Sequence, residues 1–147
     1  MKLDEKKIYL VAPSFGCTTE PYKTRLKVAI KNLEKVGFKI VKGKNIFKND
    51  GVVASSSPLS RGEEFDDAFF NSDAKYILSV GGGELMDEML PFVDFKKIKE
   101  SNIKDKVFIG FSDNTNLTFT LTTLCDLTTI YGINDLIFMN IHLLMIL

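Results

Sequence analysis

The sequence is poor in the residues that most often mark metal or redox chemistry. Its 147 residues include one histidine, two cysteines and no tryptophan. Cys17 and Cys125 lie far apart and have no metal-ligand spacing, which favours two buried or half-buried thiols in a reducing cytoplasm. We therefore expect neither a metal site nor a disulfide framework.

The charges of the chain exclude the usual signature of a nucleic-acid-binding protein. Its 19 basic and 19 acidic residues cancel, so we expect no nucleic-acid partner. Residues 1–5 are too polar to begin a secretion signal, and the apolar residues 136–147 are too few to cross a bilayer. The sequence therefore predicts a cytoplasmic protein with no membrane partner.

Strands and helices are predicted to alternate along a single domain. The expected strands cover residues 7–12, 38–41, 76–80, 107–109 and 128–131. The expected helices cover residues 20–36, 61–71 and 95–100, and a last one begins at Asp113 or Asn114, while residues 42–60 form a loop. Alternating βα units of this kind predict an α/β fold, a flavodoxin-like parallel sheet with helices on both faces.

Apolar spacing predicts which side of each helix is buried. Thr19 is expected to cap the first helix and Gly37 to end it. The residues at core spacing are, helix by helix, Leu26, Ala29, Ile30, Leu33 and Val36; Phe65, Ala68 and Phe69; and Leu117, Leu121 and Leu124. A further amphipathic segment carries Leu85, Met89 and Leu90 and is interrupted by Pro91.

The most informative stretch surrounds Ser112, where a short strand turns sharply into a helix. A serine at such a turn has the geometry of a nucleophile elbow, which lifts the hydroxyl clear of the sheet near the helix N-terminus. The N–H of Asp113 would then be free to stabilise an oxyanion. The alternative is that Ser112 and Asp113 form an ordinary helix N-cap. The general elbow G-x-S-x-G has a second glycine where this chain has Asn114.

Three other stretches, two before this elbow and one after it, fit the same family pattern in the same order. They are Val11-Ala12-Pro13-Ser14-Phe15-Gly16, Gly81-Gly82-Gly83-Glu84-Leu85 and Thr129-Ile130-Tyr131-Gly132. With the Gly110-Phe111-Ser112-Asp113-Asn114-Thr115 stretch, they resemble the LD-carboxypeptidase family of serine peptidases, which includes the microcin-immunity proteins. The resemblance runs from about Lys7 to Gly132.

The resemblance implies an activity and a set of site residues. Family members use a Ser-Glu-His triad to cleave L,D-amide bonds of murein peptides, or to release a peptidyl or aminoacyl group from a toxic nucleotide conjugate. Ser112 would be the nucleophile, and an N–H of Gly81 or Gly82 would join that of Asp113 in the oxyanion hole. The resemblance implies a peptide or peptidyl-nucleotide substrate, no metal or organic cofactor, and a homodimer for full-length relatives. The glycine run also fits a tight turn that binds no ligand.

The resemblance also predicts how the domains are organised. Residues 1–132 would be the N-terminal nucleophile domain, whereas the family's Glu and His lie in a second, C-terminal domain that this sequence lacks. We interpret residues 133–147 as an aberrant apolar tail, of the kind that a frameshift, a premature stop or a truncated gene model produces. We therefore expect the chain to be inactive by itself.

Other titratable residues fit the triad poorly. His142 lies in the apolar tail, which favours a buried or frayed histidine over a triad base. Glu63, Glu64, Glu84 and Glu88 are expected on solvated helix faces. A second hypothesis remains open, namely a non-enzymatic flavodoxin-like module that binds an anion or nucleotide at a helix N-terminus.

Overall fold

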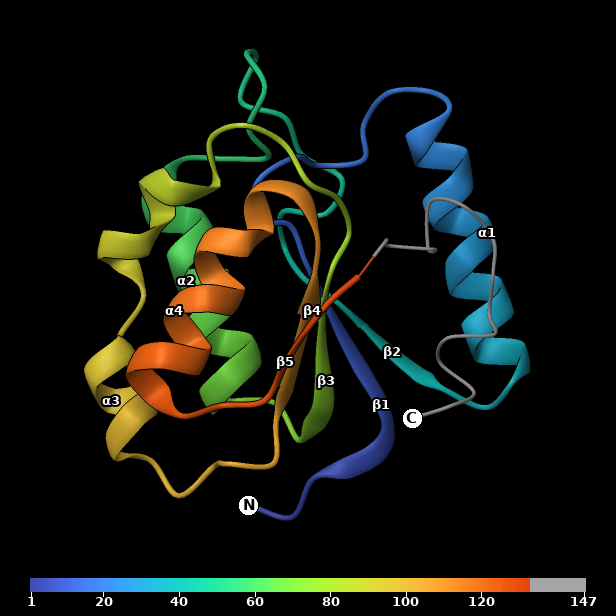
Figure 1. Ribbon diagram of the computed structural model, residues 1–147. Helices are drawn as coiled ribbons and strands as arrows, with labels where there is room; N and C mark the ends of the chain where they lie inside the picture. The colour runs from blue at the N-terminus through green and yellow to red at the C-terminus, as the bar shows by residue number, and fades with distance from the viewer. Residues whose placement is uncertain (133–147) are drawn as a thin grey trace.

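The computed structural model describes residues 1–132 and shows a five-stranded parallel sheet (Figure 1). Its strands are β1 (Asp4–Val11), β2 (Lys39–Lys42), β3 (Ala74–Ser79), β4 (Val107–Gly110) and β5 (Thr129–Tyr131). They lie in the order β2-β1-β3-β4-β5, and every neighbouring pair is parallel. This is the flavodoxin-like order, so the predicted fold class is confirmed.

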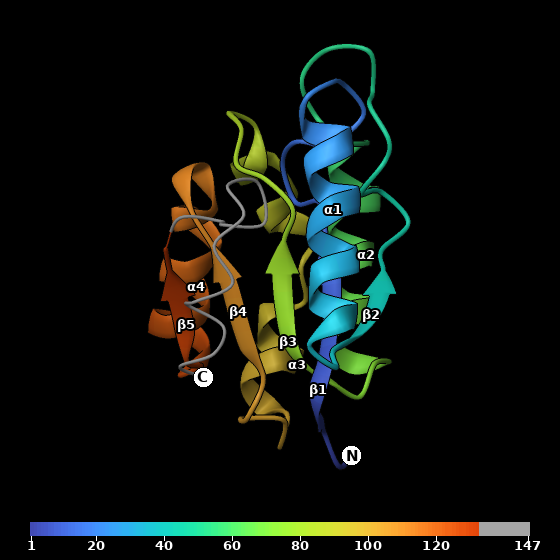
Figure 2. The ribbon, with the colours of Figure 1, turned by 90° about the vertical axis from the view of Figure 1, so that its right-hand side faces the viewer.

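Helices cover both faces of the sheet, as the sequence predicts. Helix α1 (Tyr22–Lys35) lies on one face, and α2, α3 and α4 pack on the other (Figures 1 and 2). The bounds of these three are Pro58–Phe70, Phe95–Glu100 and Thr115–Cys125, and two 3₁₀ helices, η1 and η2, cover Met86–Phe92 and Ser112–Asn114. No helix in the described residues is both long and apolar enough to span a membrane.

The central strands supply side chains to two cores because successive residues of a strand point to opposite faces. Ile8 and Leu10 of β1 pack with α1, whereas Tyr9 and Val11 pack with α2 and α4 on the other side. Burial of one such aliphatic side chain stabilises the fold by about 1.5–3 kcal/mol. The near-continuous apolar runs that predict buried parallel strands therefore supply side chains to the helix layers on both faces of the sheet.

Helix α1 ends as predicted but begins differently. Gly37 has φ +95°, and the N–H groups of Gly37 and Phe38 donate to the carbonyls of Glu34 and Leu33, which forms a Schellman motif. Thr19 was predicted to cap the helix, but the helix begins at Tyr22 and has no side-chain cap. The prediction for Val36 was also wrong, because this residue follows the last helical turn and is 46% exposed.

Helix α2 begins at Pro58, earlier than the predicted Arg61. The side chain of Ser57 accepts a hydrogen bond from the N–H of Ser60, and proline is favoured in the first helical turn because its missing N–H has no partner to lose. The Ser57-Pro58 pair is a signal that could have placed this helix from the sequence.

The buried side of α4 differs from the prediction at one position. Leu117 and Leu121 are buried as expected, but Leu124 is 54% exposed. Cys125, which follows Leu121 by four residues, takes the core position instead and is fully buried. Both cysteines are free and buried, as predicted, and burial raises the pKa of the Cys17 thiol to about 12.

Candidate functional site

Ser112 has the backbone conformation of a sharp, strained turn. It lies two residues after the end of β4 and has φ +60°, in the left-handed region that residues other than glycine rarely adopt. Its side chain is exposed rather than packed into the core. Strained residues of this kind cluster at functional sites, and the elbow geometry predicted from the sequence is present.

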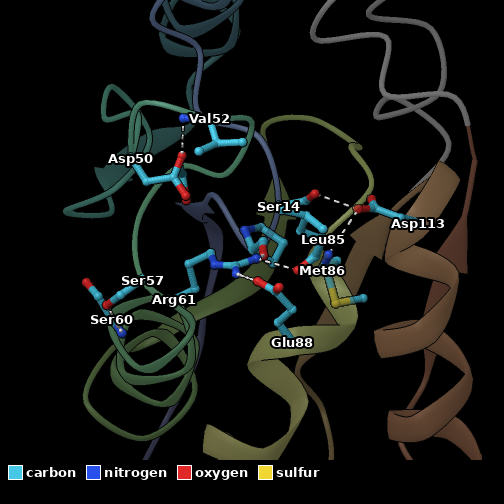
Figure 3. A network of polar contacts seen from close by, with 12 residues as sticks. Ser14, Asp50, Val52, Ser57, Ser60, Arg61, Leu85, Met86, Glu88 and Asp113 are labelled. Atoms are coloured by element: carbon cyan, nitrogen blue, oxygen red, sulfur yellow. Dashed lines mark hydrogen bonds and ion pairs between the residues drawn. The ribbon is translucent and has the colours of Figure 1, made fainter.

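The alternative reading of Ser112 and Asp113 as a helix N-cap is wrong. Neither η2 nor α4 has a side-chain hydrogen bond at its N-cap. The Asp113 carboxylate instead points away from the helix and accepts hydrogen bonds from the Ser14 hydroxyl, at 2.5 Å, and from the Met86 N–H, at 3.3 Å (Figure 3). Burial raises the pKa of Asp113, and these two hydrogen bonds oppose part of that increase.

Three turns converge at the carboxyl ends of the strands. Ser14 after β1 contacts Asp113 after β4 through the hydrogen bond just described. A Cβ on Gly82, after β3, would lie only 2.6 Å from Ser112 Cβ and 3.0 Å from its Oγ. One on Gly83 would collide with the Ser14 hydroxyl. The glycines thus let the backbone approach the elbow more closely than any other residue would allow.

The two glycines proposed as oxyanion donors differ in their surroundings. The N–H of Gly81 is directed at the Ser79 hydroxyl, at 3.4 Å, and Gly81 is buried. Among the described residues, none accepts a hydrogen bond from the Gly82 N–H. Asp113 lies in the first turn of η2, where N–H groups lack intrahelical acceptors. Of the two glycines, Gly82 therefore has the N–H that is available to act beside the Asp113 N–H in the predicted oxyanion hole.

Asn114 accounts for the departure from the general elbow motif. It is fully buried, and its side-chain amide donates to the carbonyl of Gly81, at 3.0 Å, and to that of Phe111, at 2.9 Å. The asparagine thus ties the elbow to the glycine turn. Gly110 makes room for it, since a Cβ there would lie 2.8 Å from that of Asn114.

Tyr131 is a neighbour of the elbow that sequence reasoning did not single out. Parallel pairing aligns it with Gly110, and its hydroxyl accepts a hydrogen bond from the Ser112 N–H at 3.3 Å. Its position in the Thr129-Ile130-Tyr131-Gly132 stretch was the only available signal.

The four glutamates expected on solvated helix faces do not behave alike. Glu63, Glu84 and Glu88 are exposed, although Glu84 lies in a bend rather than a helix. The prediction for Glu64 was wrong, because it is 1% exposed and its carboxylate accepts the N–H groups of Ala12, at 2.8 Å, and Asn45, at 2.7 Å. Burial raises its pKa.

Two further predictions concern metals and the tail. The described residues contain no group of three or more histidine, cysteine or acidic side chains placed to hold a metal ion. His142 and the predicted tail of residues 133–147 lie outside the described residues.

Residues 8–132 match the family model of the LD-carboxypeptidase N-terminal domain. The chain belongs to the LD-carboxypeptidase family. It is 34% identical to the microcin C7 self-immunity protein MccF of Escherichia coli over 110 residues, which make up 75% of this chain and 31% of that protein. The chain thus spans about a third of the length of this curated relative.

Solved structures of the LD-carboxypeptidase family share this fold. An MccF-like protein from Bacillus anthracis superposes with a TM-score of 0.76 at 28% identity, over 90% of this chain and 39% of that one. MccF in complex with aspartyl sulfamoyl adenosine gives a TM-score of 0.74 at 29% identity, over 88% of this chain and 37% of that one. A muramoyltetrapeptide carboxypeptidase from Oxalobacter formigenes has a TM-score of 0.63 at 24% identity, over 78% of this chain and 36% of that one, and shows the shared fold alone.

Proposed function

We propose that residues 1–132 form the nucleophile domain of an LD-carboxypeptidase-type serine peptidase, with Ser112 as the nucleophile. The observation that carries the proposal is the left-handed backbone of an exposed serine at the carboxyl end of β4, with Gly82 packed directly against it. A strained serine at a strand-to-helix turn is the structural signature of an activated nucleophile in α/β hydrolases. Family membership supports the same assignment.

In this proposal the elbow supplies the nucleophile and the oxyanion hole. Ser112 Oγ attacks the scissile carbonyl, and the N–H groups of Asp113 and Gly82 stabilise the negative charge that develops on its oxygen. The tetrahedral intermediate then collapses to an acyl-enzyme and expels the amine, to which the base passes the proton taken from Ser112, and water later releases the acyl group as a carboxylic acid. No step requires a metal or an organic cofactor.

The proposal assigns the base to another part of the enzyme. A serine hydroxyl is a poor nucleophile unless a neighbouring group takes its proton. The family resemblance places the His that does so, and the Glu that orients it, in a second domain that follows residues 1–132. We therefore propose that residues 1–132 by themselves turn over substrate only negligibly.

Two substrate classes are consistent with the family. One is an L,D-amide in a murein peptide, and the other is an aminoacyl or peptidyl nucleotide conjugate. The second is supported by the MccF structures solved in complex with aspartyl sulfamoyl adenosine, glutamyl sulfamoyl guanosine and adenosine monophosphate. In another MccF structure, an active-site mutant, a serine, an asparagine and a lysine are each replaced by alanine.

The experiment combines the full chain with the second domain of Escherichia coli MccF, either fused or as a separate chain. The assembly is offered an L,D-tetrapeptide and, separately, aspartyl sulfamoyl adenosine, and product release is measured. We expect hydrolysis of at least one substrate, and Ser112→Ala should lower kcat by about 10⁴-fold or more. Thr123→Ala is the matched control, since it removes an exposed hydroxyl from α4, the helix that follows the elbow, and should leave the rate unchanged.

Two outcomes would contradict the proposal. Ordinary turnover by the chain alone, lost in His142→Ala, would mean that the base lies within residues 133–147. Tight binding of the nucleotide with no dependence of any reaction on Ser112 would favour the alternative, a non-enzymatic flavodoxin-like module that binds an anion or nucleotide.

A further inference from the structure

Helix α2 directs a buried guanidinium toward the edge of the sheet that carries the elbow. The side chain of Arg61 is fully buried. Its Nη1 donates to the carbonyl of Pro13, at 2.9 Å, and to that of Leu85, at 2.7 Å, while its Nη2 pairs with the half-exposed Glu88 carboxylate at 2.9 Å (Figure 3). One nitrogen atom therefore joins the turn after β1 to the turn after β3.

Both carbonyls bound by Arg61 belong to residues that immediately precede the partners of Asp113. Pro13 precedes Ser14, whose hydroxyl donates to the Asp113 carboxylate, and Leu85 precedes Met86, whose N–H donates to the same oxygen. Arg61 thus fixes the two segments that hold Asp113. Asp113 in turn is the residue after Ser112 and carries one of the proposed oxyanion donors.

Stability alone does not explain a buried arginine at this position. Burying a charge is unfavourable unless it is well paired, and Nε of Arg61 has no hydrogen-bond partner in the described part of the chain. Replacement of a buried ionic group by apolar side chains is often neutral for stability or even favourable. An apolar side chain, however, cannot donate hydrogen bonds. The planar guanidinium of Arg61 donates to two carbonyls on different loops.

We propose that Arg61 is a positioning residue for the nucleophile elbow. It holds the turns after β1 and β3 at the spacing that fixes the Asp113 carboxylate, and thereby the orientation of the Asp113 N–H beside Ser112. This inference rests on the proposed function, and it adds a requirement for a residue that does not itself touch the substrate.

The test measures kcat and KM of the assembled enzyme for Arg61→Met and Arg61→Lys. Displacement of catalytic groups by about 1 Å can cost about 100-fold in rate, so we expect Arg61→Met to lower kcat by about that factor with KM changed less than about threefold. Arg61→Lys keeps a donor near the two carbonyls and should recover kcat to within about tenfold of wild type.

Two control variants separate positioning from general stability. Glu88→Gln removes the ion pair but leaves both carbonyl bonds in place, and it should leave kcat unchanged. Phe69→Leu loosens the core side of the same helix about two turns from Arg61, near the C-terminal end of α2. If Phe69→Leu, measured well below its melting temperature, lowers kcat as much as Arg61→Met does, Arg61 is merely structural and the proposal is overturned.

Amide hydrogen exchange in the full chain gives a readout that does not depend on activity. Arg61→Met should speed exchange at Met86 and across residues 112–114, whereas Phe69→Leu should not do so selectively. If the assembly with Arg61 intact shows no Ser112-dependent hydrolysis, the proposed function fails, and exchange still decides the role of Arg61. Unchanged exchange in Arg61→Met would overturn the positioning role.

Discussion

The two edges of the sheet use charged side chains in different ways. At the amino ends of the strands, lysines and carboxylates form exposed or half-exposed ion pairs across neighbouring segments, namely Lys7–Asp73, Lys39–Asp4 and Lys75–Glu5. At the carboxyl ends, the charged side chains of Arg61 and Glu64 are buried and bond to backbone atoms of the surrounding turns.

This difference shows which edge requires fixed geometry. An exposed ion pair contributes little to stability because solvent screens both charges and the long side chains lose freedom. A buried polar side chain is costly to desolvate, but once its partners are in place it allows only one arrangement of the loops around it. The amino-end edge therefore tolerates substitution, whereas the carboxyl-end edge holds three turns around Ser112.

Among the variants that test this contrast between the two edges, the largest expected effect is that of Gly82→Ala on the assembled enzyme. Its Cβ would lie 2.6 Å from that of Ser112, so the glycine turn or the elbow must shift. We expect kcat to fall by about 100-fold, because a displacement of this size misplaces nucleophile and oxyanion donor together. Gly81→Ala is the matched control, since its Cβ would meet Phe15 at an ordinary 3.6 Å. Equal losses in both variants would contradict the close-approach argument.

The second prediction concerns the stability of the carboxyl-end edge. Glu64→Ala leaves the buried N–H groups of Ala12 and Asn45 without their acceptor. We expect the free energy of unfolding, measured by urea denaturation, to fall by about 2–4 kcal/mol. Glu63→Ala on the same helix removes an exposed carboxylate and should have a much smaller effect. Similar losses in the two variants would mean that the burial of Glu64 does not matter.

Lys106 is the exception at the amino-end edge and gives a prediction about pH. It is buried, and its ammonium group donates to the carbonyls of Ala68 and Ser72 at the end of α2. Burial lowers its pKa to about 8, so the folded chain releases this proton at a lower pH than the unfolded chain. The free energy of unfolding contributed by Lys106 should therefore increase as the pH rises from about 8 toward its ordinary pKa of 10.5.

The measurement for Lys106 compares wild type with Lys106→Met by urea unfolding at about pH 7 and about pH 9.5. Stability of the wild type relative to the variant should increase at the higher pH. Other groups titrate equally in both proteins, so the difference isolates Lys106. A difference that stays constant with pH would show that Lys106 keeps an ordinary pKa in the fold.

The smallest effect is expected at an exposed pair of the amino-end edge. Lys39→Ala removes the partner of Asp4, which is a solvated contact. We expect no resolvable change in melting temperature by calorimetry, at low or at moderate salt. A clear loss of stability that disappears with added salt would show that this edge also depends on its charges, and the contrast between the two edges would fail.

The sequence predicts the order of elements, the fold class and the elbow because each depends on local signals. Apolar runs mark strands that are buried on both sides, and Gly37 ends α1 since only a residue that tolerates φ +95° fits there. Local patterns also placed Ser112 between a buried strand and a helix. The Ser57-Pro58 pair is also a local signal for the start of α2, but the prediction placed that start at Arg61.

What only the tertiary structure decides is which partner each polar side chain finds. Glu63 and Glu64 are neighbours of one type, but α2 packs so that only Glu64 faces the end of β1. Cys125 rather than Leu124 meets the core for the same reason, since packing fixes the rotation of α4. The bonds from Ser14 to Asp113 and from Arg61 to two turns join residues far apart in the chain. No local propensity encodes such contacts, because they exist only once the strands have aligned their carboxyl ends.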